Sequence, residues 1–177
     1  MDEEDSLYNI YKQIRNKVDE LKRAVGFKCN ICGSCCTPNI EFYQEDYWYA
    51  KENNIDLSGF NIEKFKNGYE FFIGFRERPG KPDHNIPSFI HRDYGCYYEV
   101  RKEGDSCAWK CAIHPYNPLI CYTFPFAINL SRGILVNQLD KCNGASNVIK
   151  EAFKKEIKLK KEISELIQNY KDFEYKI

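Results

Sequence analysis

Residues 29–36 read CNICGSCC, which places four cysteines in one short loop and makes the last two adjacent. Two intervening residues allow a turn to point successive sulfurs at one centre. The first three cysteines therefore match a loop that wraps three corners of an iron–sulfur cubane. Neighbouring side chains usually diverge, so we expect Cys36 to face a different centre from Cys35. The sequence predicts that one mononuclear ion does not hold all four thiols.

A second group of cysteines lies between residues 107 and 142. It occupies the segments CAWKC, HPYNPLIC and DKCNG. The eight candidate metal ligands of the two groups are Cys29, Cys32, Cys35, Cys36, Cys107, Cys111, Cys121 and Cys142. Metal binding that joined the two groups would be coupled to folding. An iron–sulfur cluster is the favoured cofactor. Zinc is the alternative, although a zinc site more typically takes two cysteines from each of two knuckles.

The ninth cysteine and the three histidines are not among the eight candidate ligands. Cys96 stands apart from both groups, and we interpret it as a small buried apolar residue, with ligation of a metal as the alternative. His114 follows Cys111 by three residues, so its ligation of a metal stays open. His84 and His91 have no partners at metal-ligand spacing, and we interpret them as structural or surface residues.

Composition indicates a cytosolic protein. The chain of 177 residues has nine cysteines, and clustered cysteines in a reducing compartment bind metal more often than they form disulfides. Its 26 basic and 26 acidic residues balance, which argues against a nucleic-acid-binding domain. No apolar run is long enough to cross a membrane, and the acidic start MDEEDSLYNIYKQ differs from a signal peptide. The sequence leaves open whether the protein binds a protein partner, and it identifies none.

The apolar pattern predicts a single small α+β domain over residues 1–177. Its cysteine-rich metal-site core spans 27–144, and amphipathic helices flank the core at 3–25 and 146–170. The first helix is predicted to end at Gly26, and its apolar face comprises Leu7, Ile10, Tyr11, Ile14, Val18, Leu21 and Val25. The apolar face of the last helix comprises Val148, Ile149, Phe153, Ile157, Ile163, Leu166, Ile167 and Tyr170.

Short antiparallel strands and one further helix are predicted inside the core. Strands are expected at residues 39–43, within the aromatic-rich stretch 68–100, and in a hairpin at AINLSRGILVNQL. The segment QEDYWYAKENN predicts a helix, and we interpret Glu45 and Asp46 as charges that favour its N-terminus.

The motifs CNICGSCC, CAWKC, H-x3-P-x2-C-x2-F-P-F and C-x-G together resemble the CxxCxxCC family, the YkgJ-like cysteine-cluster proteins described as chelating zinc or iron. The resemblance covers residues 27–144 and implies that the eight candidate ligands are the cysteines that define the family. One branch is similar to flagellin lysine methylases, for which the resemblance implies an iron–sulfur cluster in the cysteine region.

Three functions follow as hypotheses. The leading one is a metal-binding protein with an electron-transfer or accessory role. The second is an iron–sulfur-dependent enzyme or subunit, with protein-lysine methylation as the nearest analogy. The third is a structural zinc module that presents a surface to a partner. The sequence contains no G-x-G-x-x-G, P-loop, H-E-x-x-H or G-x-S-x-G motif, so no catalytic residue is assigned.

Overall fold

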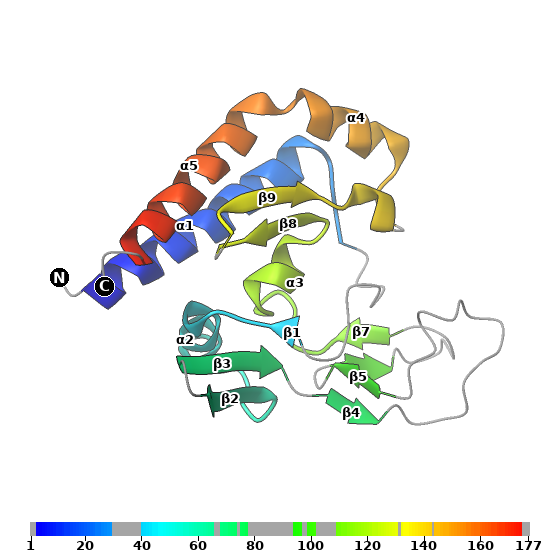
Figure 1. Cartoon of the computed structure of the whole chain (residues 1–177). Coiled ribbons are helices and arrows are strands. Elements are labelled where there is room, and N and C mark those ends of the chain that lie inside the picture. Colours follow the sequence, from blue (N-terminus) through cyan, green and yellow to red (C-terminus); the bar gives the residue numbers. More distant parts are fainter. Residues whose placement is uncertain are drawn as a thin grey trace. The chain divides into compact units, whose positions relative to one another are not determined.

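The structure of the chain is a computed structural model (Figure 1), which describes residues 3–29, 40–65, 68–73, 75–77, 94–96, 99–101, 109–130, 132–142 and 144–174. The chain divides into two compact units. Unit 1 comprises Met1–Asn30 and Thr123–Ile177, and unit 2 comprises Ile31–Tyr122. That residues 1–177 form one domain stays a prediction.

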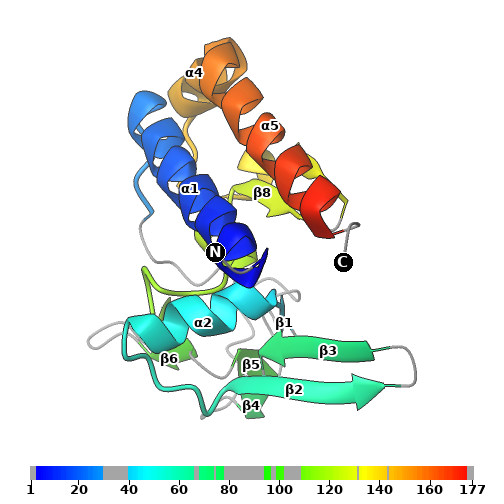
Figure 2. The same ribbon diagram turned by 90° about the vertical axis from the view of Figure 1, so that its left-hand side faces the viewer.

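Unit 1 is built from helices and one β-hairpin. Its elements are α1 (Glu3–Ala24), β8 (Phe126–Asn129), β9 (Ile134–Asn137), the 3-10 helix η1 (Leu139–Lys141), α4 (Asn147–Lys155) and α5 (Ile157–Glu174). Helices α1 and α5 lie side by side and run antiparallel (Figure 2). The predicted N-terminal helix is present as α1, and the predicted C-terminal helical region is present as two helices, α4 and α5.

Helix α1 forms because its apolar residues recur on one face. The predicted face is buried, apart from the half-buried Ile10, and comprises Leu7, Tyr11, Ile14, Val18, Leu21 and Val25. Ile163 and Ile167 of α5 are fully buried as well. The two helices thus place their apolar stripes in the core of unit 1.

The end of α1 is set by Gly26, as predicted. Gly26 has a φ of 71°, and its N–H donates to the carbonyl of Arg23 at 3.1 Å. The N–H of Phe27 donates to the carbonyl of Lys22 at 2.8 Å. This pair of hydrogen bonds is the Schellman motif, in which glycine tolerates the left-handed conformation. The buried Phe27 then packs edge-to-face on Phe126, with ring centroids 5.7 Å apart.

The prediction of one continuous C-terminal helix is wrong, because the helix breaks at Glu156. Glu156 leaves helical geometry with a ψ of 84°, and its carboxylate accepts the N–H of Leu159 at 3.1 Å. This side chain therefore caps the start of α5. Two residues assigned to the apolar face are instead exposed, Val148 by 78 % and Ile157 by 71 %. At about 3.6 residues per turn, Val148 lies off the side of α4 that buries Phe153, and Ile157 lies off the side of α5 that buries Ile163.

The predicted hairpin is confirmed, with Asn129 paired to Ile134 at its tip. Its turn uses a glycine, Gly133, with a φ of 66°, and the N–H of Gly133 donates to the carbonyl of Leu130 at 3.0 Å. The side chain of Asn129 accepts the N–H of Arg132 at 2.8 Å. These bonds satisfy the backbone groups that the reversal of the chain leaves outside the strand ladder.

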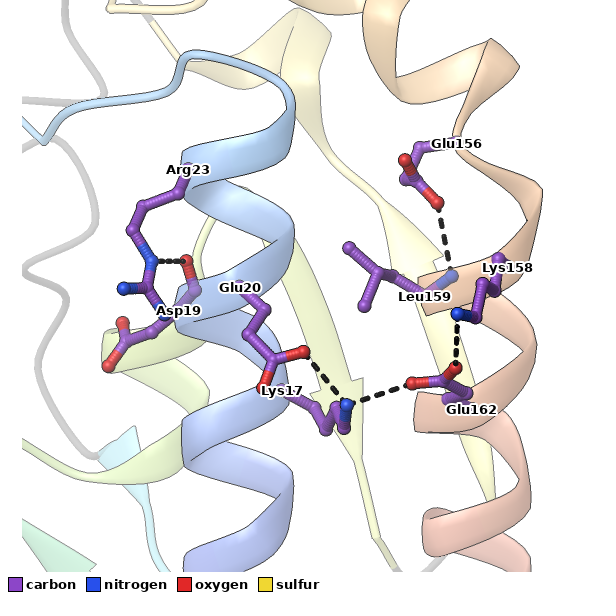
Figure 3. A network of polar contacts seen from close by, with 8 residues as sticks. All are labelled: Lys17, Asp19, Glu20, Arg23, Glu156, Lys158, Leu159 and Glu162. Carbon is purple, nitrogen blue, oxygen red and sulfur yellow. Dashed lines mark hydrogen bonds and ion pairs between the residues drawn. The ribbon is translucent and has the colours of Figure 1, made fainter.

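An ion-pair network joins α1 to α5 (Figure 3). The ammonium of Lys17 lies 2.8 Å from Glu20 and 2.9 Å from Glu162. The hydrogen bonds that Lys17 donates to these two carboxylates raise the pKa of Lys17, and the bond to Glu162 lowers the pKa of that carboxyl. The three side chains are 29–40 % exposed, so solvent screens the pairs, and the network contributes less to the contact between the helices than the apolar stripes do.

Unit 2 combines short antiparallel strands with two short helices. Its elements are β1 (Ile40–Glu41), α2 (Gln44–Glu52), β2 (Phe60–Phe65), β3 (Gly68–Ile73), β4 (Phe75–Glu77), β5 (Tyr94–Cys96), β6 (Glu99–Arg101), β7 (Trp109–Cys111) and α3 (Leu119–Thr123), whose last residue belongs to unit 1. Strands β1, β3 and β2 form one sheet in that order, and β4–β5 and β6–β7 form two separate pairs.

The coarse fold class is confirmed: helices are combined with short antiparallel strands. Strand β2 and helix α3 were not expected from the sequence. Among the residues that the structure describes, helices account for more of the regular structure than strands do. No helix in the described part of the chain has the length and apolar content needed to cross a membrane.

Candidate metal centre

The structure describes four of the eight candidate ligands. Cys29 is exposed and follows the end of α1, whereas Cys111, Cys121 and Cys142 are half-buried. The other four candidates, Cys32, Cys35, Cys36 and Cys107, lie outside the described residues. His84 and His91 lie outside them too.

Unit 2 brings Cys111 and Cys121 to one apolar cluster. The cluster consists of the buried residues Phe42, Ala50, Phe60 and Ile113, and both cysteines pack against it. Cys111 is the last residue of β7, where it pairs with Glu99 of β6, and Cys121 lies in the middle of α3. A strand and a helix thus hold two thiols against the same group of side chains.

A buried carboxylate fixes the start of the helix that carries Cys121. Asp46 is 2 % exposed, and one of its oxygens, Oδ1, accepts the N–H of Leu119 at 2.6 Å. The N–H of Cys121 and that of Tyr122 donate to the carbonyl of Pro118, at 2.9 and 2.8 Å. These bonds supply partners for the N–H groups that a helix N-terminus leaves without an intrahelical acceptor.

In unit 1, backbone turns fix the position of Cys142. Its N–H donates to the carbonyl of Leu139 at 3.2 Å, and its carbonyl accepts the N–H of Ala145 at 3.0 Å. Leu139 is buried, which anchors the 3-10 helix that precedes this cysteine. Cys29 instead follows the Schellman turn at Gly26, with the exposed Lys28 between that turn and the thiol.

The chemistry of the described donors suits a soft or borderline metal. Thiolates select zinc, copper(I) and iron–sulfur clusters, whereas calcium and magnesium take oxygen ligands. Within the described ranges, no three side chains of histidine, cysteine, aspartate or glutamate come together as a set that could hold a metal ion. The eight-cysteine assignment stays a prediction.

The remaining candidates are placed only in part. His114 is half-buried in the turn between Cys111 and α3, and its peptide bond to Pro115 is cis. Its ligation of a metal stays a prediction. Cys96 ends β5, where it pairs with Phe75, and its predicted burial falls outside the described side chains.

The interpretation of Asp46 as a charge at a helix start is confirmed but incomplete. Its second oxygen, Oδ2, accepts the N–H of Tyr43 at 2.8 Å, which caps α2. The bond to Leu119 was missed, because nothing in the local pattern around residue 46 points to a partner 73 residues away. Glu45, the other acid of this turn, is buried as well.

Comparison with known families identifies the chain. Comparisons with curated proteins and with solved structures gave no match. Residues 28–155 match the sequence model of the family described as "CxxCxxCC: Putative zinc- or iron-chelating domain". The match covers more than half of the chain and includes both cysteine groups. The chain therefore belongs to the CxxCxxCC family.

Proposed function

We propose that the protein binds an iron–sulfur cluster through thiolates of its eight candidate cysteines and serves electron transfer or the support of another protein's cluster chemistry. The observation that carries this proposal is the spacing of Cys29, Cys32 and Cys35, with two residues between successive cysteines. Such a run matches a loop around three corners of a cubane, which requires several thiolates from one segment. Membership of a zinc- or iron-chelating family agrees with the proposal.

The packing of Cys111 and Cys121 supports a role in tuning a bound metal. Both thiols lie against apolar side chains, including Phe42 and Ile113. An apolar surround limits the access of water to metal-bound sulfur, and solvent access is one of the factors that set the reduction potential of a cluster. When bound, such a cluster would supply one-electron redox chemistry.

Zinc is the second candidate, because the family description names it beside iron. Four thiolates on one zinc ion form a closed structural site that contributes directly to folding. In that case the protein is a structural module, and its function lies in the surface that it presents to a partner.

The redox proposal implies a location and a type of partner. Thiolate ligands need a compartment in which cysteines stay reduced, and we infer the cytosol on this ground. The partner would be a protein that donates electrons to the bound cluster or accepts electrons from it.

Anaerobic purification of the full chain tests the proposal. The purified protein is analysed for iron, acid-labile sulfide and zinc, and its visible absorption spectrum is recorded. We expect iron and sulfide in equal amounts, with a broad thiolate-to-iron absorption that bleaches on reduction. Stoichiometric zinc in a colourless protein would contradict the cluster and support the structural module.

A further inference from the structure

One carboxylate links two helices that are far apart in the sequence. Asp46 accepts the N–H of Tyr43 through Oδ2 and the N–H of Leu119 through Oδ1, at 2.8 and 2.6 Å. The first bond caps α2, and the second bond holds the first residue of α3. When the carboxyl is ionised, bonds of this kind are charge-assisted and stronger than bonds between neutral groups. Because Asp46 is 2 % exposed, water does not replace either bond easily.

Helix α3 needs such an anchor because it has only five residues. A helix of this length is not stable alone, since its few intrahelical bonds do not compensate for the cost of nucleation. Its position therefore depends on the packing of its buried residue Leu119 and on the cap that Asp46 provides. A shift of this N-terminus would move the whole helix.

Cys121 lies two residues after Leu119 in the same helical turn. It packs against the apolar cluster that Cys111 also contacts. Metal sites demand ligand positions accurate to about 0.5 Å, so a small shift of α3 would displace the sulfur of Cys121 from a bound metal. Groups that orient ligands without touching the metal change metal affinity by roughly 10–100-fold.

We propose that Asp46 is a positioning residue for metal binding: it fixes the start of α3 and thereby the thiol of Cys121. This inference rests on the proposed function, in which Cys121 is a ligand. It does not depend on which metal is bound, because zinc and iron both require a fixed thiolate.

The test is a double-mutant cycle on the full chain, with Zn²⁺ as the probe and a colorimetric chelator as the competitor. Asparagine at position 46 keeps one acceptor oxygen but turns an NH₂ donor toward the other backbone N–H. We expect Asp46→Asn to weaken Zn²⁺ binding by roughly 10–100-fold. In a Cys121→Ser background the same substitution should change the affinity by no more than about 2-fold.

Two controls separate positioning from a general loss of stability. Asp56 lies in the same unit and accepts the N–H of Ser58 at 3.0 Å, but it is exposed. The same substitution there, Asp56→Asn, should leave the affinity within about 2-fold of the native value. In a Cys142→Ser background, Asp46→Asn should keep its full effect. Co²⁺ spectra give a second readout, since the thiolate-to-cobalt bands should lose intensity in Asp46→Asn.

Three results would overturn the proposal. The first is native Zn²⁺ affinity in Asp46→Asn, and the second is an undiminished effect of that substitution in the Cys121→Ser background. The third is native affinity in Cys121→Ser itself, which would show that this thiol is not a ligand. The iron and zinc content of the purified protein tests the cluster proposal separately. Failure of that proposal can therefore be distinguished from failure of the positioning role of Asp46. If Asp46→Asn does not fold, Asp46→Glu, which keeps the charge at a longer reach, is judged by the same criteria.

Discussion

The two units differ in the interactions that stabilise each of them internally. In unit 1, α1 and α5 pack against each other, and the fully buried side chains include Tyr11, Ile14, Val18, Leu21, Ile163 and Ile167. The described part of unit 2 has a smaller apolar cluster and strands that form one three-stranded sheet and two isolated pairs. Isolated strand pairs are marginally stable in water.

The candidate ligands are concentrated in unit 2, the unit with the smaller apolar cluster among its described residues. Unit 2 contains six of the eight candidate ligands, namely Cys32, Cys35, Cys36, Cys107, Cys111 and Cys121. Apolar burial is therefore expected to stabilise unit 1, whereas unit 2 is expected to depend on bound metal as well.

The largest expected effect of a single substitution concerns the core of unit 1. Ile163→Ala should lower the free energy of unfolding by about 2–5 kcal/mol, because it leaves a cavity where the side chain is fully buried. Ile157→Ala in the same helix removes the same atoms from a side chain that is 71 % exposed, and its effect should stay within about 0.5 kcal/mol. Chemical denaturation followed by circular dichroism measures both values. Equal effects would mean that α5 is not packed as described.

The second effect concerns the thiols of unit 2. Cys121→Ser should remove the stabilisation that bound metal provides, which is about 4 kcal/mol when free metal exceeds the dissociation constant by 1,000-fold. In metal-free protein the same substitution should have a much smaller effect. Cys96→Ser is the matched control and should retain the metal. Thermal unfolding with and without Zn²⁺ measures the difference. A Cys121→Ser protein that zinc stabilises fully would argue against the ligand assignment.

The third effect concerns the end of α1. Gly26→Ala should lower the free energy of unfolding by about 1–2 kcal/mol, because alanine is strained at a φ of 71°. The space beside Gly26 is open, so backbone strain alone should account for the loss. Gly26→Asn should be milder, since asparagine tolerates this conformation better. Identical stability of the alanine and glycine proteins would contradict the Schellman geometry.

The smallest effect concerns the ion pair between Lys17 and Glu162. Because the pKa of Glu162 is lowered, the ion pair stabilises the fold at a pH above about 4.5, the ordinary pKa of this carboxyl. This stabilisation is lost as the pH falls below that value. The raised pKa of Lys17 means that the contribution is also lost as the pH rises above 10.5. A double-mutant cycle with Lys17→Met and Glu162→Gln, measured at neutral and acidic pH, should give a coupling that disappears in acid.

A second ion pair, with both residues on α5, gives the control for this cycle. Lys161 and Glu165 lie 3.8 Å apart and are both exposed, so their coupling should be smaller at every pH. High salt should weaken both couplings by screening. A coupling between Lys17 and Glu162 that persists in acid would show that the contact is not ionic.

Local sequence patterns predicted the parts of the fold that local interactions determine. The apolar spacing along α1, the stop at Gly26 and the hairpin turn at Gly133 all act within a few residues. The break at Glu156 was missed because it depends on one side chain that folds back onto Leu159. Nothing in the apolar periodicity marks such a cap.

The candidate site was predictable in its chemistry but not in its geometry. The spacing of the cysteines and the family motifs identified metal-binding residue types. That Cys111 and Cys121 share one apolar cluster depends on how β7 and α3 pack, which the sequence does not display. The bond between Asp46 and Leu119 was equally hidden, because it joins two segments of unremarkable local pattern. Tertiary contacts, not local propensities, therefore determine the arrangement of the described thiols.

Hydrogen–deuterium exchange on metal-loaded and metal-stripped full-length protein tests most directly whether metal organises unit 2. Removing the metal should increase exchange in peptides that cover α2, β7 and α3. Peptides from the middle of α1 and α5 should stay protected, because the apolar core of unit 1 does not involve the cysteines. Unchanged protection in unit 2, or an equal loss of protection in α1 and α5, would contradict the proposed division between an apolar unit and a metal-dependent one.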